Sequence, residues 1–165
     1  MSCDSKYTGR SVILELADND CTSMPAENDF YKVGAINTKS FTLGAGEIDT
    51  TADDNLDNTS SSITSYTTLE VTADGKARSV DDTISNHAKV VVDFVNSQNA
   101  GLSPKKWVRL VFPDITFVIW CLVTDPCSRS GSDTDAVTFS FAAKATSRNI
   151  GPASPAINVS VTPQV

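Results

Sequence analysis

The chain has 165 residues, with 20 acidic and 13 basic side chains and a formal net charge of −7. This length predicts one domain with a sizeable core, and the acidic balance disfavours a protein that binds nucleic acid by neutralising phosphates. The 20 Ser and 18 Thr residues favour strands with polar outer faces over a helical bundle, and no apolar run is long enough to span a membrane.

The first half of the chain is predicted to consist mostly of strands. Val12–Leu16 is a short apolar stretch, and residues 31–43 predict one or two strands with a break near Gly34. Residues 66–73 alternate between apolar and polar side chains, which predicts a half-buried strand. Its buried face would carry Leu69, Val71 and Ala73.

Residues 44–65, which lie between two of these strands, predict a long polar loop or hairpin. No Lys or Arg occurs between Lys39 and Lys76. The same stretch holds seven acids: Glu47, Asp49, Asp53, Asp54, Asp57, Glu70 and Asp74. Outside it, acids and bases balance, so this segment carries the entire net charge. It is either a solvated acidic loop or a surface that repels polyanions or meets a basic partner.

One amphipathic helix is predicted at about residues 82–97, capped by Asp81 or Asp82. Its apolar positions recur at helical spacing, so they are predicted to face the core. These positions are Ile84, Ala88, Val91, Val92 and Val95. His87, Lys89 and Asp93 are predicted to lie on the outer side of the helix.

The second half of the chain returns to strands. Trp107–Phe112 alternates, residues 115–123 are apolar enough for a central strand, and residues 137–143 and 157–161 predict two more. We therefore expect a mainly β protein, a sandwich or barrel with one flanking helix, that forms a single domain over residues 1–165.

The residue types that support catalysis or metal binding are sparse. The chain has one histidine, His87, and its four cysteines form no C-x-x-C pair. Asp53, Asn55 and Asp57 are spaced like the start of a calcium loop, but the glycine and glutamate that such a loop needs later are missing. No nucleophile, phosphate-binding or dinucleotide-binding motif occurs. We therefore expect neither an enzyme nor a bound cofactor or metal.

One segment resembles a known family. Residues 31–51, YKVGAINTKSFTLGAGEIDTT, resemble the N-terminal half of the tail tube (major tail) proteins of long-tailed bacteriophages, in which a strand of this pattern leads through small residues to an acidic segment. The order of the elements that follow also fits that family: a polar excursion, an alternating strand, one helix and further strands. The length suits the minimal tube domain without an additional C-terminal immunoglobulin-like domain.

The resemblance implies a structural protein of the virion tail, made and assembled in the host cytoplasm. Such proteins form hexameric rings that stack into a hollow tube, and DNA passes through the lumen without specific binding. Their partners are further copies, together with the tape measure, tail terminator and distal tail proteins; no membrane is involved.

The resemblance also assigns roles within the polar segment, which would reach the next subunit. Gly44 and Gly46 would let the chain turn out of the sheet, and three apolar residues, Ile48, Leu56 and Ile63, would anchor the segment on its neighbour. Its acids would line or edge the lumen; the candidates are Glu47, Asp49, Asp53, Asp54 and Asp57.

An alternative from another class is a carbohydrate- or protein-binding β-sandwich module of a fibre or adhesin. Trp107 or Trp120 would then be a ligand platform, although the apolar run around Trp120 favours a place in the core. A tail terminator or the tube of a contractile secretion system would share the architecture of a tail tube. Electron microscopy of the purified protein separates tubes or rings from a glycan-binding monomer.

Overall fold

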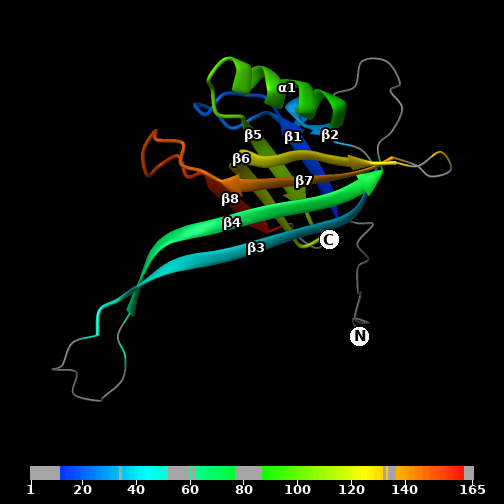
Figure 1. Cartoon of the computed structure of the whole chain (residues 1–165). Helices are drawn as coiled ribbons and strands as arrows, with labels where there is room; N and C mark the ends of the chain where they lie inside the picture. Colours follow the sequence, from blue (N-terminus) through cyan, green and yellow to red (C-terminus); the bar gives the residue numbers. More distant parts are fainter. Residues whose placement is uncertain are drawn as a thin grey trace.

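The computed structural model describes residues 12–33, 35–51, 60, 62–76, 87–131, 133 and 137–161. These residues form a mainly β structure with one α-helix, which confirms the predicted fold class (Figure 1). The elements are β1 (Ile13–Ala17), a 3-10 turn (Glu27–Asp29), β2 (Tyr31–Lys32), β3 (Ala35–Asp49), β4 (Ser62–Lys76), α1 (His87–Asn99), β5 (Lys105–Val111), β6 (Ile115–Ser130), β7 (Thr138–Ala145) and β8 (Ile157–Val161). Within the described part of the chain, no helix has the length and apolar character that crossing a membrane requires.

All strands belong to one antiparallel sheet in the order β2-β1-β5-β6-β7-β4-β3. The long strand β6 organises this sheet, because its first part pairs with β5 and β8 and its second part pairs with β7. Figure 1 shows β1 and β5 running steeply across the direction of β7, β4 and β3, so the sheet bends over itself. It does not close, since no pairing joins β3 to β2 among the described residues. The architecture is therefore an open, folded sheet and not a barrel.

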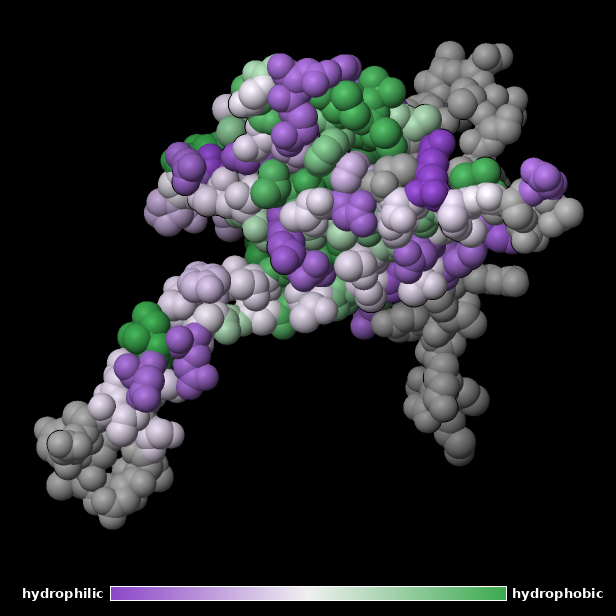
Figure 2. Space-filling view, in the orientation of Figure 1, coloured by the Kyte–Doolittle hydropathy of each residue, from purple (hydrophilic) through white to green (hydrophobic). Residues whose placement is uncertain are grey.

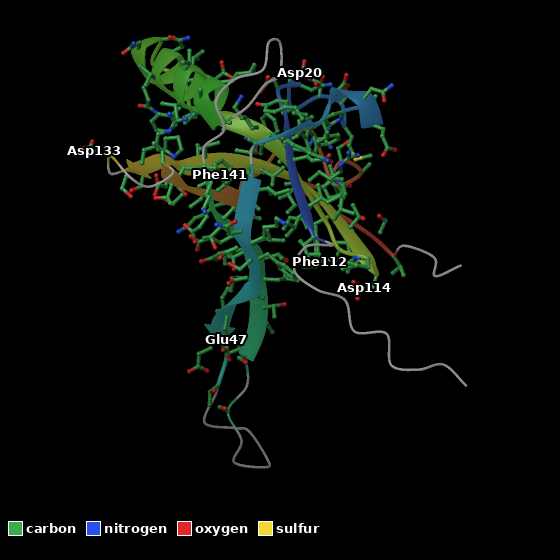
Figure 3. The ribbon with its side chains drawn as sticks, turned by 90° about the vertical axis from the view of Figure 1, so that its right-hand side faces the viewer. Asp20, Glu47, Phe112, Asp114, Asp133 and Phe141 are labelled. Carbon is green, nitrogen blue, oxygen red and sulfur yellow. The ribbon has the colours of Figure 1, made fainter. Side chains whose placement is uncertain are left out.

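The two ends of this strand order approach each other through side chains. Phe41 on β3 lies 5.4 Å from Phe112 and 4.7 Å from Phe117, measured between ring centroids. Lys39 on the same strand donates a hydrogen bond to the backbone carbonyl of Val12, just before β1. These contacts enclose the core from the open side. Figure 3 shows Phe112 at the end of β5, far from Glu47 on the projecting part of β3.

The core takes alternate residues from five strands and one residue from the helix. The alternation predicted for β4 is confirmed, because Leu69, Val71 and Ala73 are all buried. The other fully or almost fully buried members include Leu14, Leu16, Val33, Val90, Val108, Leu110, Phe117, Ile119, Cys121, Phe139, Phe141 and Ala143. Burial of each large apolar side chain contributes about 1.5–3 kcal/mol, so this cluster dominates the stability of the fold.

Helix α1 ends in a well-defined capping arrangement. Gly101 has a φ of +70°, and its N–H donates to the carbonyl of Gln98 at 3.0 Å. The N–H of Leu102 donates to the carbonyl of Ser97 at 2.8 Å. This pair of bonds satisfies the last carbonyls of the helix and needs the left-handed conformation that glycine adopts without strain. The helix ends at Asn99, two residues beyond its predicted end at residue 97, while its predicted start at residue 82 lies outside the described residues.

The predicted core face of α1 is wrong for Val92 and Val95. Val90 is completely buried and Phe94 packs against the core, whereas Val92 is 56% exposed and Val95 is 48% exposed. Ala88 and Val91 are half-buried, and Ile84 lies outside the described residues. The helix is rotated so that part of its valine stripe points outward. The physical reason lies in the charged side chains of its inner side, described below.

Candidate assembly interface

The hairpin formed by β3 and β4 projects away from the body (Figure 1). Its outer part is here called the distal hairpin and comprises residues 43–49 and 62–68. The segment predicted as a polar loop or hairpin is therefore a hairpin over its described residues. Leu56, Asp53, Asp54 and Asp57 lie outside the described residues.

The distal hairpin carries apolar side chains in solvent. Ile48 and Ile63 are direct partners across the two strands, and both are about half exposed or more. Leu43 and Tyr66 are exposed on the same hairpin, closer to the body. Figure 2 shows the resulting small apolar patch near the end of the hairpin, separate from the rest of the apolar surface. This exposed apolar pair is a candidate contact surface for another molecule.

Acidic groups flank the apolar pair. Glu47 and Asp49 are exposed neighbours of Ile48 on β3. The Thr51 hydroxyl donates a hydrogen bond of 2.5 Å to Asp49, and the Thr51 N–H donates another of 2.8 Å. These bonds lower the pKa of Asp49, so this carboxylate stays ionised at neutral pH. The distal hairpin is thus an apolar surface with a negative edge.

The predicted role of the two hairpin glycines needs correction. Gly44 and Gly46 lie within β3 and neither has a positive φ, so they do not turn the chain out of the sheet. A Cβ on Gly46 would lie 2.5 Å from Oγ of Ser65 and 2.7 Å from the ring of Tyr66. The strand pairing shifts register at this point, between Ala45 and Glu47. Glycine at position 46 leaves room for these two side chains of β4, which any larger residue would have to displace.

A closed ring of four alternating charges lies between α1 and the sheet; it is called the ionic ring below. Lys106 on β5 contacts Asp18 after β1 and Asp93 on the helix, the latter at 2.8 Å. Lys89 on the helix contacts the same two carboxylates and lies 2.8 Å from Asp93. The Tyr31 hydroxyl on β2 donates to Asp18 at 3.0 Å. The ring therefore joins the helix to three separate segments of the sheet region.

Hydrogen bonds hold the ionic ring in its charged form. Burial works against the charge on Asp18 and Asp93, but the hydrogen bonds from Lys106 and Lys89 outweigh it and lower the pKa of both carboxyls. Burial also opposes the charge on Lys89, yet its bonds to the two aspartates raise its pKa. Lys89 and Asp93 were predicted to lie on the outer side of the helix; they instead face the sheet, and this fixes the rotation of α1.

The ionic ring makes a pH dependence testable. The pKa values of Asp18 and Asp93 are lower in the folded state than the usual value of about 3.9 in an unfolded chain. Their contribution is therefore complete above that value and is lost as the pH falls through the folded pKa values. We expect the free energy of unfolding to fall less steeply below about pH 5 in Asp93→Asn than in the wild type. Urea unfolding at a series of pH values measures this difference, and two parallel profiles would contradict the prediction.

The two tryptophans do not form a ligand platform. Trp107 is fully buried and Trp120 nearly so, in a second small cluster where their ring centroids lie 5.4 Å apart. Nε1 of Trp107 donates to the carbonyl of Asp20 at 2.9 Å, and Arg148 lies over its ring. The platform suggested for a carbohydrate-binding module is thus contradicted, because neither ring reaches solvent to stack on a sugar.

The described part of the chain does not bring metal-binding side chains together. No cluster of three or more His, Cys, Asp or Glu side chains there could hold a metal ion. Burial raises the pKa of the Cys121 thiol, which leaves it protonated and unreactive.

Sequence reasoning missed the ionic ring because its four residues lie far apart in the chain. The only local signal is the i,i+4 spacing of Lys89 and Asp93, which an exposed helix face also shows.

No family model and no curated protein matches this sequence. Solved structures do match. The tail of an empty gene transfer agent (GTA) particle, reconstructed with C6 symmetry, superposes with a TM-score of 0.63 at 12% identity, covering 96% of this chain and 100% of the other. The SPP1 tail tube gives a TM-score of 0.55 at 14% identity, covering 85% of this chain and 76% of the other.

A third match comes from the baseplate of the anti-feeding prophage. It has a TM-score of 0.51 at 8% identity, covering 96% of this chain and 97% of the other. The chain therefore has the fold found in the tail tubes of phages and phage-like particles.

Proposed function

We propose that this chain is a tail tube protein, a structural and non-catalytic component of a virion tail. The observation that carries the proposal is the match, over nearly the whole length of both chains, to a protein of the GTA tail. In this proposal the chain acts as one tail-tube-like domain that forms hexameric rings, and the rings stack into a conduit for DNA. Its partners would be further copies and the proteins at the two ends and in the lumen of the tube.

The surface of the chain supports a polymer. The outer edge of β3 has no partner strand among the described residues, and long unpaired edges associate unless they are covered. The distal hairpin adds an exposed apolar pair beyond the body. Both features are liabilities in a monomer and become contacts in a ring or a stack.

The charge of the chain suits a duct for DNA. The acids of the hairpin region have no nearby Lys or Arg in the sequence, since none occurs between residues 39 and 76. Six-fold repetition would multiply each lumen carboxylate, and a negative wall repels the phosphates of passing DNA. A positively charged wall would instead capture phosphates and slow transit.

Electron microscopy of the purified protein tests the proposal directly. We expect hollow tubes or rings with six-fold symmetry in averaged images. Analytical ultracentrifugation across a range of concentrations and salts provides the second measurement. A protein that stays monomeric under all of these conditions would refute the proposed function.

Replacing the exposed pair of the distal hairpin with charge is expected to abolish polymerisation without unfolding the chain. The double variant Ile48→Asp and Ile63→Asp adds two exposed acids beside Glu47 and Asp49, at positions outside the core, so that four acids lie close together. Repulsion and the loss of apolar contact both act against association. Turbidity and negative-stain microscopy measure tube formation, and circular dichroism measures folding.

The matched control is Ile48→Val with Ile63→Val, which keeps the apolar character of the pair and should still form tubes. Equal polymerisation of the Asp and Val variants would show that the hairpin plays no part in assembly.

A further inference from the structure

The outward face of α1 is an apolar surface that the chain itself does not cover. Val92 and Val95 are exposed on the helix, and Leu102 is exposed just after it. Figure 2 shows apolar side chains gathered on the helix at the top of the molecule. The ionic ring holds Lys89 and Asp93 toward the sheet, so the helix cannot roll to bury its outer valines without breaking two ion pairs, Lys89–Asp18 and Lys106–Asp93. The exposed face is therefore a fixed property of the fold.

A basic side chain stands beside this face. Lys105 opens β5 shortly after the end of α1 and lines a shallow groove with Asn96 and Ser97 of the helix and with the four residues of the ionic ring. It is exposed, and no ion pair is recorded for it within the described residues. Lys89 and Lys106 in this groove are paired with Asp18 and Asp93, so Lys105 leaves the edge of the helix with a net positive charge.

The distal hairpin has the complementary character. Its paired Ile48 and Ile63 supply apolar surface, and Glu47 and Asp49 supply a negative edge without any base nearby in the sequence. The hairpin points away from α1 in Figures 1 and 3, which view the molecule from directions 90° apart. The hairpin of a chain therefore does not reach the helix of the same chain.

We propose that the outer face of α1 is the docking site for the distal hairpin of a second copy. This inference rests on the proposed function, because it names the surface that receives the hairpin in the polymer. A contact between two different patches of the same chain is heterologous, and such contacts extend without limit unless rotation closes a ring. The apolar pair would cover Val92 and Val95, and Lys105 would face the acids of the hairpin.

Photo-crosslinking within assembled protein tests the contact. A benzophenone amino acid is placed at Ile63, and tubes are grown from a mixture of 14N- and 15N-labelled chains so that contacts between copies are recognised by mass. After irradiation, we expect crosslinked peptides that join position 63 of one copy to residues 91–105 of another. The same probe at Val159, an exposed position on β8, serves as the control and should not label that region.

A charge exchange provides an independent readout. Lys105→Glu is expected to slow tube growth several-fold at low salt, and the second change Glu47→Lys in the same chain should restore growth. Tubes whose crosslinks from position 63 fall outside residues 91–105 would overturn the docking site while leaving the proposed function intact. Absence of tubes in the wild type would overturn both.

Discussion

Val90→Asp is expected to prevent the chain from folding. Val90 is completely buried where α1 meets the sheet, so the new carboxylate would lie in the core without a partner. Burying an unpaired charge costs several kcal/mol even after the group is neutralised, and a domain has only about 5–15 kcal/mol of net stability. Circular dichroism and urea unfolding of the purified variant measure the outcome, and we expect loss of the cooperative transition.

Val92→Asp is the matched control, because it makes the same change two residues along the same helix. Val92 is mostly exposed, and surface changes of this kind usually alter stability by no more than about 0.5 kcal/mol. The variant should fold and unfold like the wild type. If the two variants were equally unstable, the rotation assigned to α1 would be wrong. A normal unfolding transition for Val90→Asp would lead to the same conclusion.

Lys106→Met is expected to give the second largest loss of stability. The Lys106 side chain is only 8% exposed and contacts both Asp18 and Asp93. Without it, two neighbouring carboxylates share a single cation, Lys89. Breaking a buried ion pair typically costs about 3–5 kcal/mol, but both aspartates are about a third exposed, so we expect about 2 kcal/mol. Urea unfolding at neutral pH measures this change.

Lys105→Met tests whether burial matters, since it removes the adjacent but exposed lysine and should change stability little. The triple variant Lys106→Met, Asp18→Asn and Asp93→Asn should recover part of the loss, because it removes the uncompensated carboxylates as well. Equal stability of Lys106→Met and Lys105→Met would contradict a structural role for the ionic ring.

The strands of this fold could be predicted because their signals are local. In β4, alternation alone places Leu69, Val71 and Ala73 in the core, and the structure confirms all three. The span predicted for the last strand, residues 157–161, agrees with β8. Such patterns are reliable because side chains on a strand alternate between two faces, whichever strands become its neighbours.

The orientation of the helix could not be predicted, because non-local contacts determine it. The valines at positions 91, 92 and 95 form a regular apolar stripe in the sequence, yet the inner side of α1 is built on Val90 and Phe94. The deciding contacts come from Asp18 and Lys106, which are distant in sequence from the helix. The hydrophobic periodicity of a helix contains no information about its contacts with other segments. In this chain the ion pairs to the sheet favour a rotation that differs from the one that the periodicity predicts.

The hairpin could be predicted only in part from the sequence. The sequence predicts that the stretch is polar, acidic and unsuited to a core, and this part is confirmed for its described residues. The function of its glycines could not be read from the sequence, because a glycine in a turn and a glycine beneath Tyr66 look the same there. Only the register of β3 against β4 separates the two possibilities.

The burial of both tryptophans also provides a built-in optical probe. The chain has two tryptophans, and both lie in the cluster formed with Ala17, on β5 and β6 and not on the distal hairpin. Their fluorescence should therefore follow the opening of this cluster on denaturation and should change little when copies associate through the hairpin. Tyr66 is exposed on the hairpin and would report the association step, for example through its protection from iodination. Folding and polymerisation can thus be followed separately on the wild-type sequence, with no added dye.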